Sequence, residues 1–123
     1  DHQKILIKNM NILIDLSNKF GAKPIFITQR TNSWIEKDRK IYSLPYMLTK
    51  TNLEISNHYA YEKFVSDIVM KNCKKKDIFC INLFEKLKFD INDTYDFNHV
   101  NPNGSSKVSN AIFENLKNYV IFN

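Results

Sequence analysis

Pro24-Ile25-Phe26-Ile27-Thr28-Gln29 is a short, continuous apolar run in this chain of 123 residues. A run of this length without polar alternation predicts a strand that is buried on both faces, as in a parallel sheet. A second run of the same kind, Ile78-Phe79-Cys80-Ile81-Asn82-Leu83, lies further along the chain. The fold class depends on what surrounds these two predicted strands.

Helical periodicity surrounds both runs. Residues 2–20 predict a helix whose apolar face is formed by Ile5, Leu6, Met10, Leu13, Leu16 and Phe20. Gly21 is a stop signal just past its end. Residues 56–73 predict a second helix, with Lys74-Lys75-Lys76 at its C-terminal end. A last helix is predicted to start near Asn101 or Pro102, with an inward face of Val108, Ala111, Ile112 and Leu116.

The connections between these elements are of two kinds. Residues 30–54 are polar and aromatic with no clean period, and they predict a long excursion with one short helix. Residues 84–95 predict a connection that contains a short amphipathic piece at its start.

Alternation of helices with buried strands predicts an α/β fold, with a parallel sheet flanked by helices. We interpret residues 1–123 as a single α/β unit. Two strands make a poor sheet, because independent stability normally needs three or more. The fold is therefore expected to be incomplete in this chain, with part of the sheet supplied from elsewhere.

Composition and charge exclude several classes of function. The hydrophobic fraction of 43% is that of an ordinary globular domain. The formal net charge of +5 comes almost entirely from scattered lysines, since Arg30 and Arg39 are the only arginines. A nucleic-acid surface usually concentrates basic residues and adds Arg, so this pattern indicates a lysine-rich solvated surface. No apolar run approaches the about 20 residues that a membrane span needs.

Cys73 and Cys80 are the two cysteines of the chain, and they do not form a Cys-x-x-Cys pair. We expect them to be free, structural thiols. The histidines His2, His58 and His99 show no metal-ligand spacing, and no metal or cofactor is expected.

Asp96-Phe97-Asn98-His99 places a carboxylate three residues before a histidine, where a loop leads into the last predicted helix. In hydrolases an imidazole takes the nucleophile's proton, while a carboxylate bonded to the other ring nitrogen fixes the tautomer and stabilises the imidazolium. A loop histidine that bonds a neighbouring Asp, or that caps a helix, is the structural alternative.

Residues 78–104 resemble the C-terminal part of the SGNH (GDSL-type) hydrolase family. The shared features are an apolar strand, a variable loop, Asp96-Phe97-Asn98-His99, then Asn101, Gly104 and a helix with Val108, Ala111 and Ile112. The helix, Gly21 and strand before this block resemble the preceding unit of the family. The resemblance implies a flavodoxin-like three-layer fold, of which this chain is the C-terminal portion.

The same resemblance implies a function. His99 would be the general base of a serine esterase or acyl hydrolase, and Asp96 its orienting acid. The family's Gly-Asp-Ser and Gly-x-Asn blocks have no counterpart among these residues, whose only glycines are Gly21 and Gly104. The nucleophile would come from the missing N-terminal half of the domain, and the substrate would be an ester or an acylated small molecule or glycan.

Three further residues are candidates for substrate binding. Arg30 and Trp34 follow the first strand, where ligands of parallel sheets bind, and Asn98 lies between the catalytic candidates. An exposed Arg30 and a buried, packing Trp34 are the structural alternatives. The competing class of function is a non-catalytic α/β module or a degenerate hydrolase half that binds a partner.

Overall fold

The computed structural model describes residues 1–43, 55–90, 92–96 and 98–121. Its elements, in chain order, are α1 (His2–Lys19), β1 (Phe26–Ile27), β2 (Trp34–Lys37), β3 (Lys40–Ser43), α2 (Ile55–Lys76), β4 (Cys80–Ile81), α3 (Leu83–Lys86) and α4 (Pro102–Ile121). The three long predicted helices and both predicted strands are present, which confirms their positions along the chain.

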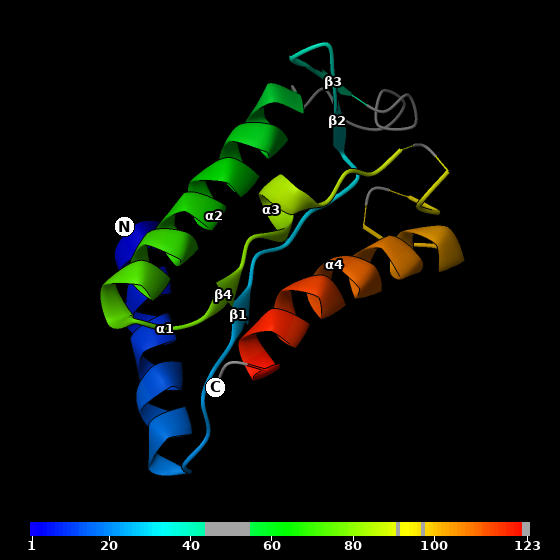
Figure 1. Cartoon of the computed structure of the whole chain (residues 1–123). Helices are drawn as coiled ribbons and strands as arrows, with labels where there is room; N and C mark the ends of the chain where they lie inside the picture. The colour runs from blue at the N-terminus through cyan, green and yellow to red at the C-terminus, as the bar shows by residue number, and fades with distance from the viewer. Residues whose placement is uncertain (44–54, 91, 97, 122–123) are drawn as a thin grey trace.

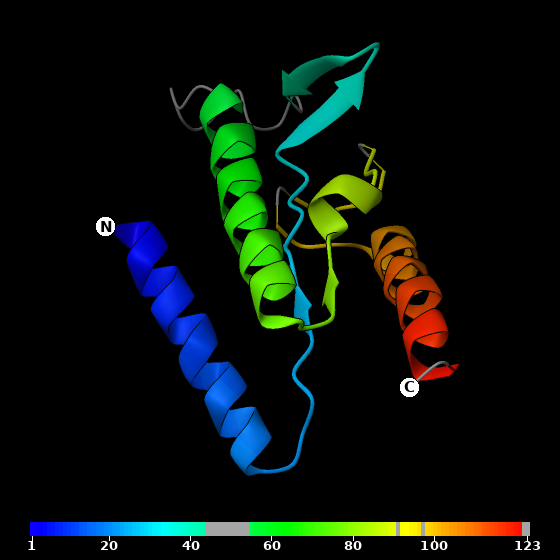
Figure 2. The same cartoon turned by 60° about the vertical axis from the view of Figure 1, so that its left-hand side comes forward.

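β1 and β4 form a parallel pair, with Phe26 opposite Cys80 and Ile27 opposite Ile81. Helices α1 and α2 lie side by side on one face of the pair, and α4 lies on the other (Figures 1 and 2). Both strands are shorter than the apolar runs predict. β4 ends early because Asn82 caps α3, its side-chain oxygen accepting a hydrogen bond from the Glu85 backbone N–H at 3.3 Å.

Two apolar clusters hold the helices to the strands. On one face, Met10 of α1 packs with Val69 and Cys73 of α2, against Phe26 and Cys80 of the strands. On the other face, Ile81, Leu83, Leu87 and Phe89 form a buried cluster beneath α4. The predicted inward face of the last helix is confirmed, since its four apolar residues Val108, Ala111, Ile112 and Leu116 pack on that cluster.

Both long helices before the strands end in the same way. Gly21, at φ +68°, follows α1, and the Ala22 N–H bonds the Ser17 carbonyl at 2.9 Å. Asp77, at φ +54°, follows α2, and the Ile78 N–H bonds the Cys73 carbonyl at 3.0 Å. These six-to-one bonds define Schellman turns, which reverse the chain directly into the strands.

The prediction of two free thiols is wrong, because Cys73 and Cys80 form a disulfide with Cα atoms 6.3 Å apart. The turn at the end of α2 brings Cys73 next to β4, seven residues away in sequence. The bond therefore fastens the C-terminal end of α2 to the strand that follows it.

Residues 34–43 form an antiparallel hairpin, β2–β3, where the sequence predicts an irregular excursion with one short helix. Asp38 and Arg39 join the two strands, with φ values of 51° and 61°. Two consecutive residues at positive φ make the turn that matches the twist of a hairpin. The rest of the predicted excursion, residues 44–54, lies outside the described residues.

Only two of the six residues of the predicted apolar face of α1 pack inward. Leu6 and Met10 pack on α2, whereas Ile5, Leu13, Leu16 and Phe20 are exposed. Ile27 of β1 is also exposed. The prediction that this strand is buried on both faces is therefore wrong.

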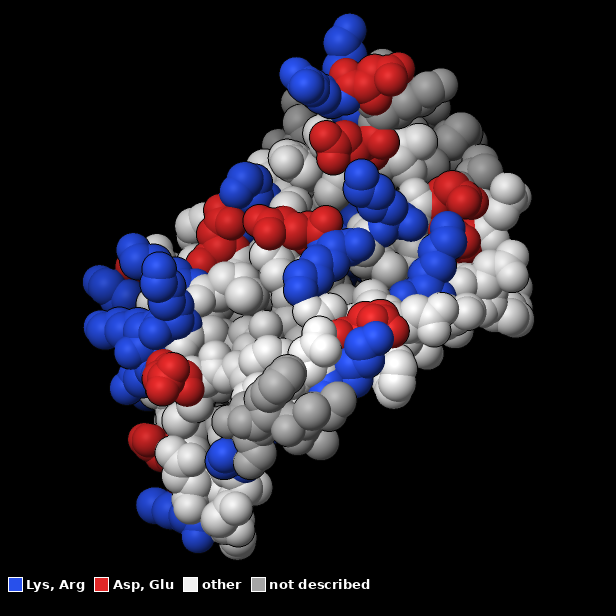
Figure 3. Space-filling view, in the orientation of Figure 1, with Lys and Arg blue, Asp and Glu red and all other residues white. Residues whose placement is uncertain are grey.

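Charged side chains are spread over the surface that Figure 3 shows, with Lys and Arg gathered at the C-terminal end of α2, where Lys74, Lys75 and Lys76 lie. Acidic and basic side chains alternate over much of the remaining surface in this view. In the described part of the chain, no helix is long and apolar enough to cross a bilayer.

Candidate active site

The segment between α3 and α4 folds back on itself as a tight hairpin. Thr94 and Val100 form an antiparallel bridge, and the Tyr95 N–H donates to the His99 carbonyl at 2.8 Å. Asp96 and His99 therefore lie in the turn of this hairpin, between the bridged residues. The loop before α4 lies beside the end of the molecule toward which β1 and β4 run (Figure 1). We call residues 94–96 and 98–100 the Asp–His hairpin.

The side chains of Asp96 and His99 are in direct contact. Nδ1 of His99 lies 2.7 Å from Oδ2 of Asp96. The other carboxylate oxygen, Oδ1, accepts the backbone N–H groups of Asn98 and His99, both at 2.8 Å. These bonds, led by the one from the His99 ring, lower the pKa of Asp96 from its ordinary 3.8 to about 2. Asp96 is therefore ionised at neutral pH and acts as the acceptor.

This contact fixes the tautomer of a neutral His99 ring. With the proton on Nδ1 directed at the carboxylate, Nε2 is left as an acceptor. The His99 side chain is 77% exposed, so its ring can be reached from outside the chain. The pair can take a proton from an incoming hydroxyl, and Asp96 can stabilise the imidazolium that results.

Asn101 joins the hairpin to the first turn of α4. Its side-chain Oδ1 accepts the N–H groups of Asn103 and Gly104 at 2.9 and 3.1 Å, which confirms it as the N-cap of α4. Its Nδ2 donates to the Asn92 carbonyl at 2.7 Å. One residue thus starts the helix and closes the loop that precedes it.

Gly104 allows the first turn of α4 to approach the loop closely. A Cβ at this position would lie 2.1 Å from the Asp93 carbonyl oxygen. That oxygen also accepts the Asn101 N–H at 3.0 Å. Only glycine leaves room for this contact, so Gly104 sets the distance between α4 and the segment that leads into the hairpin.

An ion pair ties the same segment to α4. Nζ of Lys107 lies 2.5 Å from Oδ2 of Asp93 and 3.2 Å from Oδ2 of Asp90. The hydrogen bond to Asp93 is the main cause of the raised pKa of Lys107, against a smaller opposing effect of burial. The Asp93 carboxylate also accepts the Asp90 N–H at 2.7 Å. Asp93, before the hairpin, is therefore held by Lys107. Asn101, after the hairpin, is held by its bonds to the Asn92 and Asp93 carbonyls.

Asn32, in the loop after β1, connects that loop to the segment that leads into the Asp–His hairpin. Its side-chain nitrogen donates to the Asp90 carbonyl at 3.2 Å and to Oγ1 of Thr94 at 2.5 Å. The sequence carries no signal for this role, because Asn32 meets Asp90 and Thr94 only after folding. Asn32, Asp93 and Lys107 were not among the residues predicted for the site.

The structure places Arg30 and Trp34 in the interior. Arg30 is 8% exposed, its guanidinium carbon lies 3.4 Å from the centroid of the Trp34 ring, and it donates to the Trp34 carbonyl at 2.7 Å. Trp34 is 5% exposed and donates through Nε1 to Glu62 at 3.1 Å. Asn98, in contrast, is exposed on the Asp–His hairpin. Of the three predicted binding residues, the structure therefore puts only Asn98 beside the catalytic candidates.

No family model, curated protein or solved structure matches this chain. Among the described residues, no three His, Cys, Asp or Glu side chains are grouped so that they could hold a metal ion.

Proposed function

We propose that this chain supplies the general base and its orienting carboxylate to a serine esterase or acyl hydrolase of the SGNH type. The observation that carries the proposal is the contact between Nδ1 of His99 and Oδ2 of Asp96, on a hairpin fixed at both ends. A fixed, exposed imidazole with its second nitrogen bonded to an ionised carboxylate is the arrangement that serine hydrolysis needs.

The reaction begins when a serine hydroxyl attacks the acyl carbon of an ester. Nε2 of His99 takes the hydroxyl proton as the new C–O bond forms, and Asp96 stabilises the imidazolium. The bond to the alcohol oxygen then breaks, and His99 returns the proton to the departing alcohol. Water repeats the sequence on the acyl-serine and releases the acid. The substrate is an ester or an acylated small molecule or glycan.

The serine and the oxyanion donors lie outside this chain, in the N-terminal half of the domain. The two-stranded parallel pair supports this part of the proposal, because such a pair is small for a sheet that carries helices on both faces. A flavodoxin-like three-layer fold would be completed when that half adds its strands.

The test uses the protein produced from the complete open reading frame, with a short-chain nitrophenyl ester as substrate. His99→Ala should lower kcat/KM at least ~100-fold, because it removes the proton acceptor. Asp96→Asn should lower it less, because the ring remains in place. His2→Ala is the matched control, since His2 lies in α1 and is exposed. Activity of His99→Ala within about threefold of the unchanged protein would rule the assignment out.

A second candidate, a non-catalytic module that binds a partner, is favoured by the absence of a Gly-Asp-Ser motif from this sequence. The two candidates predict different surroundings for the coding sequence. A Gly-Asp-Ser motif after an apolar strand, encoded upstream of Asp1, would favour the enzyme. A start codon directly before Asp1 would favour the module.

A further inference from the structure

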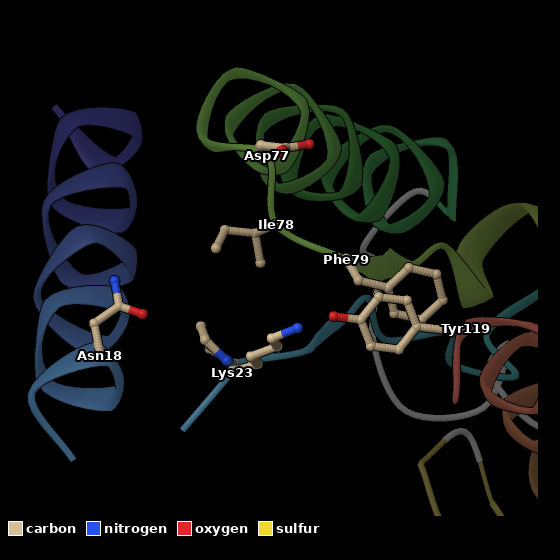
Figure 4. Close-up of a pocket in the computed structure, with 7 residues that line it drawn as sticks. Asn18, Lys23, Asp77, Ile78, Phe79 and Tyr119 are labelled. Carbon is tan, nitrogen blue, oxygen red and sulfur yellow. The ribbon is translucent and has the colours of Figure 1, made fainter. Parts of the chain in front are cut away.

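The two ends of the β1–β4 pair are built differently. At its start, a groove of about 560 Å³ opens between the segments that enter the two strands, and Asn18, Lys23 and Ile78 are among the residues that line it. Figure 4 shows this groove, with α1 on one side and the stacked rings of Phe79 and Tyr119 on the other. At the carboxyl end, beside the Asp–His hairpin, hydrogen bonds of buried side chains join the chain segments instead. Polar contacts therefore gather at the end of the strands that carries the candidate site.

The chain that leaves β1 forms a loop that is braced from within. The guanidinium of Arg30 donates to the carbonyl of Thr31 and, at 2.7 Å, to the carbonyl of Trp34. Asn32, in the middle of the loop, is 1% exposed. We call residues 30–34 the β1 loop.

Glu62 of α2 holds the β1 loop from outside. One carboxylate oxygen accepts the hydroxyl of Thr31. The other accepts the N–H of Thr31 at 3.4 Å and the indole N–H of Trp34 at 3.1 Å. A carboxylate suits this position, because both of its oxygens accept hydrogen bonds and neither has to donate. Helix α2 is therefore the support for both ends of the β1 loop.

Asn32 links the β1 loop to the Asp–His hairpin. Its side-chain nitrogen donates to Oγ1 of Thr94 at 2.5 Å and to the Asp90 carbonyl at 3.2 Å. Thr94 forms, with Val100, the bridge that closes the hairpin. Glu62, the β1 loop and Thr94 thus make a continuous series of contacts from α2 to the base of the hairpin.

The contact between Asp96 and His99 does not depend on this series. Nδ1 of His99 and the N–H groups of Asn98 and His99 all bond Asp96 within the hairpin. What Asn32 fixes is the place of the hairpin relative to β1. In the proposed reaction His99 must meet a serine that lies outside this chain, and a displacement on the order of 1 Å can cost ~100-fold in rate.

We propose that Glu62 is a positioning residue for the Asp–His pair. Through Thr31 and Trp34 it holds the β1 loop, and through Asn32 it sets the place of His99 relative to the strands. This role rests on the proposed function, because it aligns His99 with the serine. Loss of Glu62 should therefore slow the chemical step and leave the contact inside the hairpin intact.

The kinetic test uses the product of the complete open reading frame with a short-chain nitrophenyl ester. Thr31→Val removes the hydroxyl that donates to Glu62, and Glu62→Gln replaces one accepting oxygen by a donor. Each should lower kcat at least ~10-fold with KM unchanged within about twofold. Thr31→Ser keeps the hydroxyl and should retain the kcat of the unchanged protein. An unchanged kcat in both Thr31→Val and Glu62→Gln would overturn the proposal.

Ser66→Ala is the matched control. Ser66 is buried one helical turn after Glu62, and its hydroxyl bonds Oδ1 of Asn82 at 2.9 Å rather than the β1 loop. The variant removes a buried hydrogen bond of the same helix, so it should lower the thermal midpoint while kcat stays within about twofold. An equal loss of kcat in Ser66→Ala and Glu62→Gln would show that Glu62 acts through stability alone, and would also overturn the proposal.

A nuclear Overhauser effect on the same product measures the position of the hairpin without substrate. The side-chain amide protons of Asn32 should show this effect to Thr94, their hydrogen-bond partner. Thr31→Val and Glu62→Gln should weaken it, whereas Ser66→Ala should preserve it. An effect that Glu62→Gln leaves unchanged would reject the positioning role, even in an active esterase. A product without esterase activity in which the effect still depends on Glu62 would reject the proposed function alone.

A second NMR measurement separates the place of the hairpin from the contact inside it. In Glu62→Gln the amide shifts of Asn98 and His99 should keep an acidic transition with a midpoint of about 2, because their bonds to Asp96 form within the hairpin. Loss of that transition in Glu62→Gln would show that Glu62 supports the Asp–His contact itself, which would contradict the proposal.

Discussion

Lys107 of α4 holds its ammonium nitrogen 2.5 Å from Oδ2 of Asp93, a residue that is 2% exposed. A buried carboxylate requires a partner, because an uncompensated charge in the interior is costly. Lys107 is thus a positioning residue for the Asp–His hairpin, since Asp93 leads directly into it.

Removing the charge of Lys107 should therefore destabilise the protein. Lys107→Met keeps the apolar stem and should lower the free energy of unfolding by about 2 kcal/mol, as expected when a buried acceptor loses a charged donor. Urea denaturation measures the change. Lys117→Met is the matched control, because Lys117 pairs on the surface with Glu114 and such pairs contribute at most ~1 kcal/mol. An equal effect of both variants would contradict the role of Lys107.

Gly104 should tolerate no side chain. Gly104→Ala places a Cβ 2.1 Å from the Asp93 carbonyl oxygen, so backbone must move on one side or the other. We expect a loss of about 3 kcal/mol, at the upper end for overpacked sites. Thermal unfolding followed by circular dichroism measures this loss. Ser105→Ala, at the next and exposed position of α4, should leave the midpoint unchanged.

The Asp–His hairpin should loosen in acid. Because the pKa of Asp96 is lowered to about 2, its carboxylate bonds stabilise the folded hairpin fully above the ordinary value of 3.8. That contribution is lost as the pH falls from about 4 through about 2. The amide shifts of Asn98 and His99, both bonded to Asp96, should report a midpoint near 2 by NMR.

Asp96→Asn is the control for this titration, because the amide carries no titrating proton. The acidic transition at Asn98 and His99 should disappear in that variant. A midpoint near 4 in the unchanged protein would show that the bonds to Asp96 do not form in solution.

Reduction of the Cys73–Cys80 bond should destabilise α2 and β4 together. Closing a loop with a sequence separation of seven residues restricts the unfolded chain by about 2.5 kcal/mol in the entropic treatment. Cys73→Ser with Cys80→Ser should lower the thermal midpoint accordingly, and a reductant should have no further effect on that variant. A midpoint of the unchanged protein that is insensitive to reductant would contradict the stabilising role.

The sequence predicted those elements whose position depends on neighbouring residues alone. Apolar runs located β1 and β4, helical periodicity located the long helices, and Gly21 and Asn101 marked helix ends through conformations that these residue types favour. The β2–β3 hairpin was not predicted, because its turn residues, Asp38 and Arg39, lack the Asn-Gly or Gly signal usual at positive φ.

Tertiary contacts account for what the sequence did not reveal about the site. Spacing alone suggested that Asp96 could reach His99, and the two side chains do bond, while their catalytic role stays a prediction. Lys107 and Asn32 carried no comparable signal, since their partners are 14 and 62 residues away and meet them only after folding. Likewise, the separation of seven residues between Cys73 and Cys80 does not by itself predict a disulfide. The turn after α2 is what brings the two cysteines together.

The frame of the Asp–His hairpin has a consequence for protein engineering. Its bridge, its helix cap, its ion pair and its glycine contact all join residues between Asp90 and Lys107. From outside this segment, Asn32 donates hydrogen bonds to the Asp90 carbonyl and to Oγ1 of Thr94. Residues 90–107 therefore form a cassette that could be transplanted onto another α/β scaffold, provided that an asparagine is placed to receive it and that an apolar surface is placed beneath Val100.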